Sequence, residues 1–289
     1  MPAAREIGGG SVEGGSSGPG GSLEGAPGAE GFGAVAIEAA VAAGRLIRPW
    51  AGRARGVGTK GSASDLVTDL DREAERLISE LLHARFPTHA IHGEEGGAQG
   101  REGDFVWHVD PIDGTTNFVH GLPGYCVSVA LAWRGVPVAG AVYDPTADEL
   151  FAAVRGGGAY ANGRPLRVSK EDRLSESLVG TGVPPVQPSR DFAFRTVRAI
   201  APEVRNLRNL GSAALHLAYV AAGRLGGFWE PGLRAWDCAA GVLLVREAGG
   251  RASDLSGEDW HTGLRGALGT NGTIHDALLA LLAPVPASL

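Results

Sequence analysis

The segment Asp110-Pro111-Ile112-Asp113-Gly114-Thr115-Thr116-Asn117-Phe118 carries the strongest structural signal in the chain. It follows the apolar run 105–109, which has the length of a buried strand. The proline and the glycine predict a tight turn where this strand ends, and the turn would bring Asp110 and Asp113 to one side. Polar groups at strand ends commonly surround the ligand in α/β proteins. The segment therefore predicts a layered α/β protein with a site at this turn.

The composition of this turn favours phosphate chemistry on a metal. The amides of residues 114–116 are placed to open a helix, and a helix start attracts phosphate. Two close carboxylates repel each other unless a shared proton, an arginine or a metal neutralises them. Hard divalent cations prefer such oxygen ligands, so metal-assisted phosphoryl transfer is the favoured interpretation. The alternative is that Asp110 and Asp113 only form the turn.

Other carboxylates lie in three separate segments, and each has an ordinary explanation by itself. Glu94 lies in a Gly-rich loop, where a Glu pair is usually a solvated turn. Asp237 stands in the first turn of an apolar helix, where the helix dipole favours an acid. Asp65, Asp69 and Asp71 surround another helix start, and capping needs only one of the three.

Together these segments resemble the inositol monophosphatase family of lithium-sensitive, magnesium-dependent phosphatases. The resemblance covers roughly residues 32–285 and rests on six motifs, at residues 65–71, 93–95, 110–118, 211–214, 229–232 and 236–241. The resemblance implies alternating αβαβα layers, as in inositol monophosphatases and fructose-1,6-bisphosphatases.

The resemblance also implies a set of metal ligands for two to three Mg²⁺ ions. Glu94, Asp110 and the carbonyl of Ile112 would bind one ion, and Asp110, Asp113 and Asp237 a second. Glu94 would also help to bind a weaker third ion through water.

Roles in catalysis and substrate binding follow from the same resemblance. The hydroxyl of Thr115 would orient a metal-bound water, with Asp71 as its acceptor, and the amides of Gly114 and Thr115 would bind the phosphate. Lys60, one of only two lysines in the chain, would balance charge near the metals. The residues that would line the polyol or sugar are Gly211, Ser212, Ala213 and Glu230.

Composition narrows the class of protein. The 289 residues carry a formal net charge of −6, which disfavours a nucleic-acid binder that depends on bulk positive charge. Two cysteines exclude a disulfide-dense scaffold and a Cys-based zinc site. Neither a secretory signal nor an apolar run of about 20 residues is visible, so we expect a cytoplasmic protein with no membrane partner. Residues 1–31 are poor in apolar residues and predict a disordered tail before a single domain at 32–289.

The pattern of the remaining chain predicts a run of strands followed by alternating elements. Such an order implies two sheets covered by helices. We expect helices at 34–50, 66–86, 192–200, 213–222, 235–248 and 271–283. We expect strands at 105–109, 125–133, 137–143, 149–154, near 178, and at 204–207, 227–230 and 251–253.

The sequence thus predicts a Mg²⁺-dependent phosphatase of small phosphomonoesters, with inositol-1-phosphate as the leading substrate. Histidinol phosphate and fructose 1,6-bisphosphate are alternative substrates for the same metal site. A binding or regulatory protein that keeps the fold without catalysis is the alternative of another class. Lithium inhibition and a homodimer are expectations from the resemblance alone.

Overall fold

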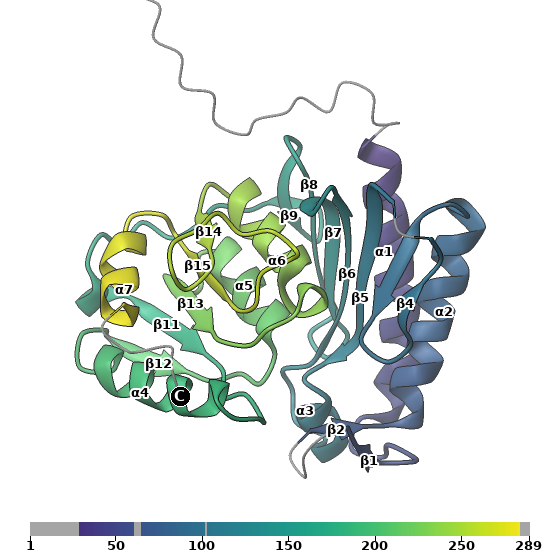
Figure 1. Cartoon of the computed structure of the whole chain (residues 1–289), viewed down its shortest axis with the longest axis horizontal. Coiled ribbons are helices and arrows are strands. Elements are labelled where there is room, and N and C mark those ends of the chain that lie inside the picture. Colours follow the sequence, from purple (N-terminus) through teal and green to yellow (C-terminus); the bar gives the residue numbers. More distant parts are fainter. Residues whose placement is uncertain (1–28, 61–64, 102, 284–289) are drawn as a thin grey trace, which may run out of the picture.

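Five layers make up the computed structural model, which describes residues 29–60, 65–101 and 103–283 (Figure 1). Helices α1 (Ala29–Ile47) and α2 (Asp69–Arg85) cover the outer face of an eight-stranded sheet. Helices α5 (Ala213–Ala221) and α6 (Ala235–Glu247) lie between this sheet and a five-stranded one. Helices α4 (Ser189–Ile200) and α7 (His275–Leu282) cover the far face of the second sheet. This is the αβαβα order that the family resemblance implies.

The large sheet has the order β10-β9-β8-β7-β6-β5-β3-β4 and is antiparallel except where β3 pairs with β5. Its strands are β3 (Ala90–Gly93), β4 (Gly97–Gln99), β5 (Phe105–Asp113), β6 (Cys126–Trp133), β7 (Val136–Asp144), β8 (Glu149–Val154), β9 (Gly158–Ala161) and β10 (Arg164–Pro165). Nearly every residue of β6 and β7 is buried, because helices cover both faces of the sheet.

The second sheet has the order β12-β11-β13-β15-β14, with parallel pairs around β11 and antiparallel pairs around β15. Its strands are β11 (Leu178–Thr181), β12 (Asn206–Arg208), β13 (Gly227–Glu230), β14 (Arg251–Ser253) and β15 (Ala267–Thr270). The remaining elements are the ribbon β1 (Gly58–Thr59) with β2 (Leu66–Val67), the helix α3 (Thr115–His120), and the 3-10 turns Arg48–Trp50 and Leu174–Glu176.

Three apolar clusters fill the spaces between the layers. One joins α1 and α2 to the large sheet and includes Ile78 and Trp107. The central cluster packs α5 and α6 between the sheets and includes Phe228 and Leu244. The third lies under α4 and α7 and includes Trp229. The strands and helices that carry the site residues are therefore packed between apolar clusters on both sides.

The boundaries of β8, β13 and β14 agree with the prediction, and those of other elements shift. Helix α2 begins at Asp69, three residues later than expected, because 66–67 pair with 58–59 and the hydroxyl of Thr68 caps the helix. Short strands at 90–93, 158–161 and 267–270 were not predicted. Each has only four residues, too few for a clear hydrophobic period.

Strand β5 differs from the prediction at the point that matters most. The sequence predicts that the strand ends before Asp110, but β5 continues to Asp113. Asp110 pairs with Ser128 and Asp113 with Cys126, so β5 contains one more residue than β6 between these pairs. This extra residue is a β-bulge, and it changes the face to which Asp113 would otherwise point. The bulge brings Asp110 and Asp113 together.

Helix α1 begins at Ala29, five residues before its expected start. Residues 1–28 hold most of the predicted disordered tail and lie outside the described residues, as do 61–64, 102 and 284–289. Within the described part of the chain, no helix is long and apolar enough to cross a bilayer.

Candidate active site

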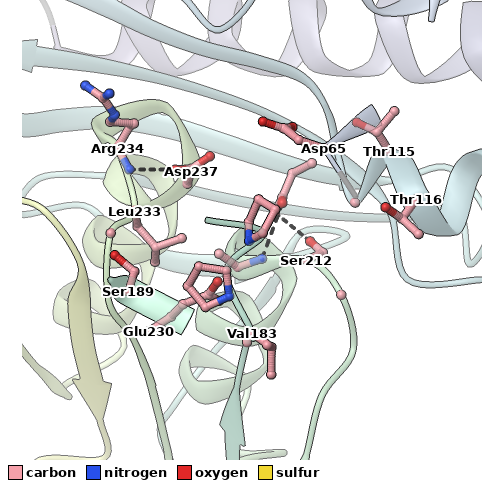
Figure 2. A pocket seen from close by; sticks show the side chains of 18 of the residues that line it. Asp65, Thr115, Thr116, Val183, Ser189, Ser212, Glu230, Leu233, Arg234 and Asp237 are labelled. Atoms are coloured by element: carbon pink, nitrogen blue, oxygen red, sulfur yellow. Dashed lines mark hydrogen bonds between the residues drawn. The ribbon is translucent and has the colours of Figure 1, made fainter. Parts of the chain in front are cut away.

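A cleft of about 990 Å³ opens where β5, α3, β13 and the start of α6 meet. Thr115 and Thr116 form one side of this cleft, and Glu230 and Asp237 lie across from them (Figure 2). Most of the predicted site residues line it: Lys60, Glu94, Asp113, Gly114, Thr115, Gly211, Ser212, Ala213, Glu230 and Asp237. Segments far apart in the sequence therefore converge on one cavity.

Asp110 lies at the base of the acidic group and is only 2% exposed. Burial raises the pKa of its carboxyl well above the ordinary value, and the charges of Glu94, Asp113 and Asp237 raise it further. Its Oδ1 accepts the N–H of Ile112 at 3.0 Å, which fixes the turn. Four carboxyl groups thus share one desolvated region.

Asp113 is oriented by the start of α5. Ser212 Oγ donates to its Oδ2 at 2.6 Å, and the amide of Ala214 donates to the same oxygen at 2.7 Å. Burial raises the pKa of Asp113 to about 6, although these donors lower it. The predicted substrate residues Ser212 and Ala213 therefore also orient Asp113, since the Ala213 amide lies 3.4 Å from its Oδ1.

Asp237 and Glu94 both lie close enough to Asp110 for their charges to raise its pKa. The amide of Arg234 donates to Asp237 Oδ2 at 2.6 Å, which orients the carboxylate at the start of α6. Lys60 Nζ lies 2.7 Å from Glu94 Oε1 and also pairs with Glu95. Burial lowers the pKa of Lys60, but the Glu94 charge and hydrogen bond raise it by more, so the ammonium stays charged. Lys60 therefore pairs with two neighbouring glutamates, one of which lines the cleft.

Thr115 and Asp71 meet as predicted. The Thr115 hydroxyl lies 3.3 Å from Asp71 Oδ1 and 3.0 Å from the carbonyl oxygen of Ile112, and it can donate its one proton to either. Asp71 Oδ2 accepts from the amide and hydroxyl of Thr68 at 2.7 and 2.6 Å. Asp71 is thus both the partner of the N-cap residue Thr68 in the capping box of α2 and the neighbour of Thr115.

The donor set fits hard cations, because all of its members are oxygen ligands. Across residues 29–60, 65–101 and 103–283, however, no group of three or more His, Cys, Asp or Glu side chains is arranged so that it could hold a metal ion. Hydrogen bonds from Ser212, Ala214 and Arg234 orient Asp113 and Asp237 in this structure. The chemistry of the donors therefore suits a hard cation, whereas their arrangement here does not enclose one.

Glu230 stands on the wall opposite α3, at the end of β13. Burial, with a smaller contribution from the Asp113 charge, raises the pKa of its carboxyl to about 8. A partly protonated carboxyl both donates and accepts hydrogen bonds, which suits a substrate rich in hydroxyl groups.

Gly182 provides the space for Glu230, and we expect Gly182→Ala to weaken substrate binding. A Cβ at position 182 would lie 1.9 Å from Glu230 Oε2, so the carboxylate must move. We expect KM to rise about 10-fold with little change in kcat, since the phosphate end of the cleft is untouched. Steady-state kinetics of the variant would measure this.

Gly103→Ala is the matched control, because its Cβ would meet nothing closer than 4.0 Å. Equal KM values for Gly182→Ala and the wild type would contradict a binding role for the Glu230 position.

Two residues that bind the backbone of the loop around Leu210 were given no role in the sequence analysis. Asn117 Nδ2 donates to the carbonyl oxygens of Gly124 and Leu210, at 2.8 and 2.7 Å. His216 contacts the same loop from α5: its Nδ1 lies 2.7 Å from the carbonyl oxygen of Ser212, and its Nε2 accepts from the amide of Leu210 at 3.1 Å. Asn117 lies in the decisive motif, but nothing in the sequence marks His216 as part of the cleft.

Comparison with known proteins agrees with this geometry. The family model described as "Inositol monophosphatase family" matches residues 30–286. The chain belongs to the inositol monophosphatase family. It is accordingly a phosphoric monoester hydrolase.

Individual inositol monophosphatase relatives align with this chain over most of their own length. An inositol-1-monophosphatase of Rhizobium meliloti is 49% identical and aligns over 70% of this chain and 76% of its own. A protein of Pseudomonas aeruginosa named Nus factor SuhB is 45% identical, over 77% of this chain and 85% of its own. The solved inositol monophosphatase of Anabaena (Nostoc) sp. PCC 7120 has a TM-score of 0.80 and 37% identity, and covers 90% of this chain and 98% of its own.

Proposed function

We propose that the chain hydrolyses a small phosphomonoester with Mg²⁺, and that inositol-1-phosphate is the leading substrate. The observation that carries this proposal is the group of carboxylates Glu94, Asp110, Asp113 and Asp237 beside the start of α3, of which Asp110 and Asp113 are buried. Bound Mg²⁺ would activate water and neutralise the phosphoryl group. Asp110 and Asp113 would hold the ions, together with Glu94, Asp237 and the carbonyl of Ile112.

The chain's own groups would position the reactants. The amides of Gly114 and Thr115 stand at the helix start, where Gly114 adopts a φ of 96°, and would hold the phosphate. The Thr115 hydroxyl would orient the attacking water, with Asp71 accepting the hydrogen bond from that hydroxyl. Lys60 would limit the repulsion between Glu94 and Glu95.

A polyol is the favoured leaving group because Glu230 and the loop 211–213 line the cleft across from the amides that would hold the phosphate. Glu230 would bind vicinal hydroxyls, and the backbone of 211–213 would line the ring. Relatives named inositol-1-monophosphatase support the same choice. The proposal also includes a homodimer, inhibition by lithium, a cytoplasmic location and a single domain from about residue 32.

A substrate panel with the purified protein tests this choice. Phosphate release would be measured with Mg²⁺ and inositol-1-phosphate, histidinol phosphate or fructose 1,6-bisphosphate. We expect inositol-1-phosphate to have the largest kcat/KM and no release once EDTA removes the metal. Turnover of histidinol phosphate without turnover of inositol-1-phosphate would contradict the proposed substrate.

A regulatory role is the second candidate, because several relatives are named Nus factor SuhB. The predicted carboxylates Glu94, Asp113 and Asp237 at the cleft, with Asp110 buried beneath them, support catalysis instead. Absence of Mg²⁺-dependent phosphate release on the whole panel would favour the regulatory role.

A further inference from the structure

Glu75 is a buried acid on α2 whose side chain has no role in the steps described above. It is only 3% exposed and lies one helical turn after Asp71. Its carboxylate accepts the amide of Glu95 at 2.8 Å through Oε2 and the amide of Gly96 at 2.6 Å through Oε1. Both oxygens therefore bind the backbone directly after Glu94.

The two glycines of the Gly93-Glu94-Glu95-Gly96 motif leave space for this carboxylate. A Cβ at Gly93 would lie 2.3 Å from Glu75 Cδ, and a Cβ at Gly96 would lie 2.6 Å from Glu75 Oε1. The glycines that flank the glutamate pair thus allow the backbone to wrap closely around Glu75. This contact gives a physical reason for a motif that sequence alone reads as a solvated turn.

The Glu94 segment is therefore fixed on both of its sides. Before it, the amide of Glu94 donates to the carbonyl oxygen of Val109 at 3.1 Å, next to Asp110. After it, Glu75 binds the next two amides. Hydrogen bonds to an ionised acceptor are stronger than neutral ones, and buried pairs of them restrict a loop strongly.

We propose that Glu75 is a positioning residue that holds the Glu94–Glu95 segment in place and so sets the affinity of the cleft for its divalent cation. The inference rests on the proposed function, since it takes Glu94 as a metal ligand. Groups that orient metal ligands commonly affect metal affinity about 10- to 100-fold. Helix α2 then contacts two parts of the site: Asp71 accepts from the Thr115 hydroxyl, and Glu75 accepts from the amide that follows Glu94.

Glu75→Gln tests the proposal because it keeps the shape but offers only one acceptor oxygen to two N–H donors. MgCl₂ alone would be titrated calorimetrically into the full chain, and kcat would be measured at saturating Mg²⁺. We expect the Mg²⁺ Kd to rise about 10-fold while kcat stays within about 2-fold. Glu80→Gln is the matched control: Glu80 is exposed on the same helix, and its carboxylate contacts only Arg76 among the described residues.

Gly96→Ala is a second variant, which displaces the Glu75 carboxylate without removing it. It should weaken Mg²⁺ binding in the same way, and it decides the question if Glu75→Gln does not fold. Wild-type Mg²⁺ affinity in these variants, or a loss of kcat at unchanged affinity, would overturn the positioning role alone. A wild-type chain that binds no Mg²⁺ would overturn the proposed function as well.

Discussion

Asp110→Asn is expected to abolish Mg²⁺-dependent phosphate release while making the metal-free protein more stable. Under the proposed function Asp110 would bind two ions, so its loss would remove several kcal/mol of transition-state stabilisation, on the order of a 10³-fold loss in kcat/KM. The metal-free variant gains stability because the wild-type carboxylate is unfavourable where it lies. Burial raises the pKa of Asp110 well above its usual value, and the charges of the nearby carboxylates raise it further. An ionised Asp110 is therefore unfavourable in the fold at neutral pH. Asparagine removes that charge and keeps the acceptor for the Ile112 amide.

Chemical denaturation in EDTA, together with thermal melts at increasing Mg²⁺, would measure the stability effect. We expect a gain of about 1–3 kcal/mol for the metal-free variant, and a much smaller Mg²⁺-induced rise in Tm than in the wild type. Asp259→Asn is the control, because that side chain is 86% exposed. Wild-type activity in Asp110→Asn would refute the metal-ligand role of Asp110, and a destabilised metal-free variant would refute its unfavourable charge.

The sequence predicted the layers well because long, strongly periodic segments determine them. The central strands of the large sheet and helices α5 and α6 are apolar runs bounded by turn residues. Burial between two layers leaves such segments few alternatives. Two sheets covered by helices could therefore be predicted from the pattern, and the resemblance implied the αβαβα order, whereas the four-residue strands at 90–93 and 267–270 could not be predicted.

The site residues were identified from their motif, but their geometry was not. The prediction placed Asp110 and Asp113 in a turn beyond the strand, whereas a β-bulge inside β5 brings them together. A bulge depends on pairing with β6, which the β5 sequence alone does not encode. The contacts of Glu75 are non-local, because its partners Glu95 and Gly96 lie about 20 residues along the chain. The partners of His216 lie only four and six residues before it, but the bend of the loop that brings them to the ring is not visible in the sequence.

His216 should make the loop at the cleft sensitive to acid. Burial lowers the pKa of its ring to about 4, although the hydrogen bond to the carbonyl of Ser212 raises it. The ring stacks on Phe228 with centroids 4.7 Å apart. Its Nε2 accepts the Leu210 amide, so this nitrogen must stay unprotonated. Protonation would therefore break the contact that holds the loop 210–212.

The sign of the effect follows from the two states of the protein. The unfolded ring titrates near 6.5 and the folded ring near 4, so the unfolded state binds more protons between these values. The contribution of His216 to stability is fully present above about pH 6.5 and is lost as the pH falls toward 4. Burial raises the pKa of carboxyls such as Glu230, and these shift stability in the opposite direction. The prediction therefore concerns the difference between the wild type and a variant that shares those carboxyls.

His216→Gln is the variant of choice, because an amide side chain offers one donor and one acceptor but does not titrate. Between about pH 7.5 and pH 5, we expect the stability of the wild type to fall by about 2 kcal/mol relative to the variant. Urea unfolding across this range would measure the difference. His120→Gln is the control, since solvent reaches that ring. A wild type and a His216→Gln variant that lose stability in parallel would show that the ring is not held neutral by its burial and by the Leu210 amide.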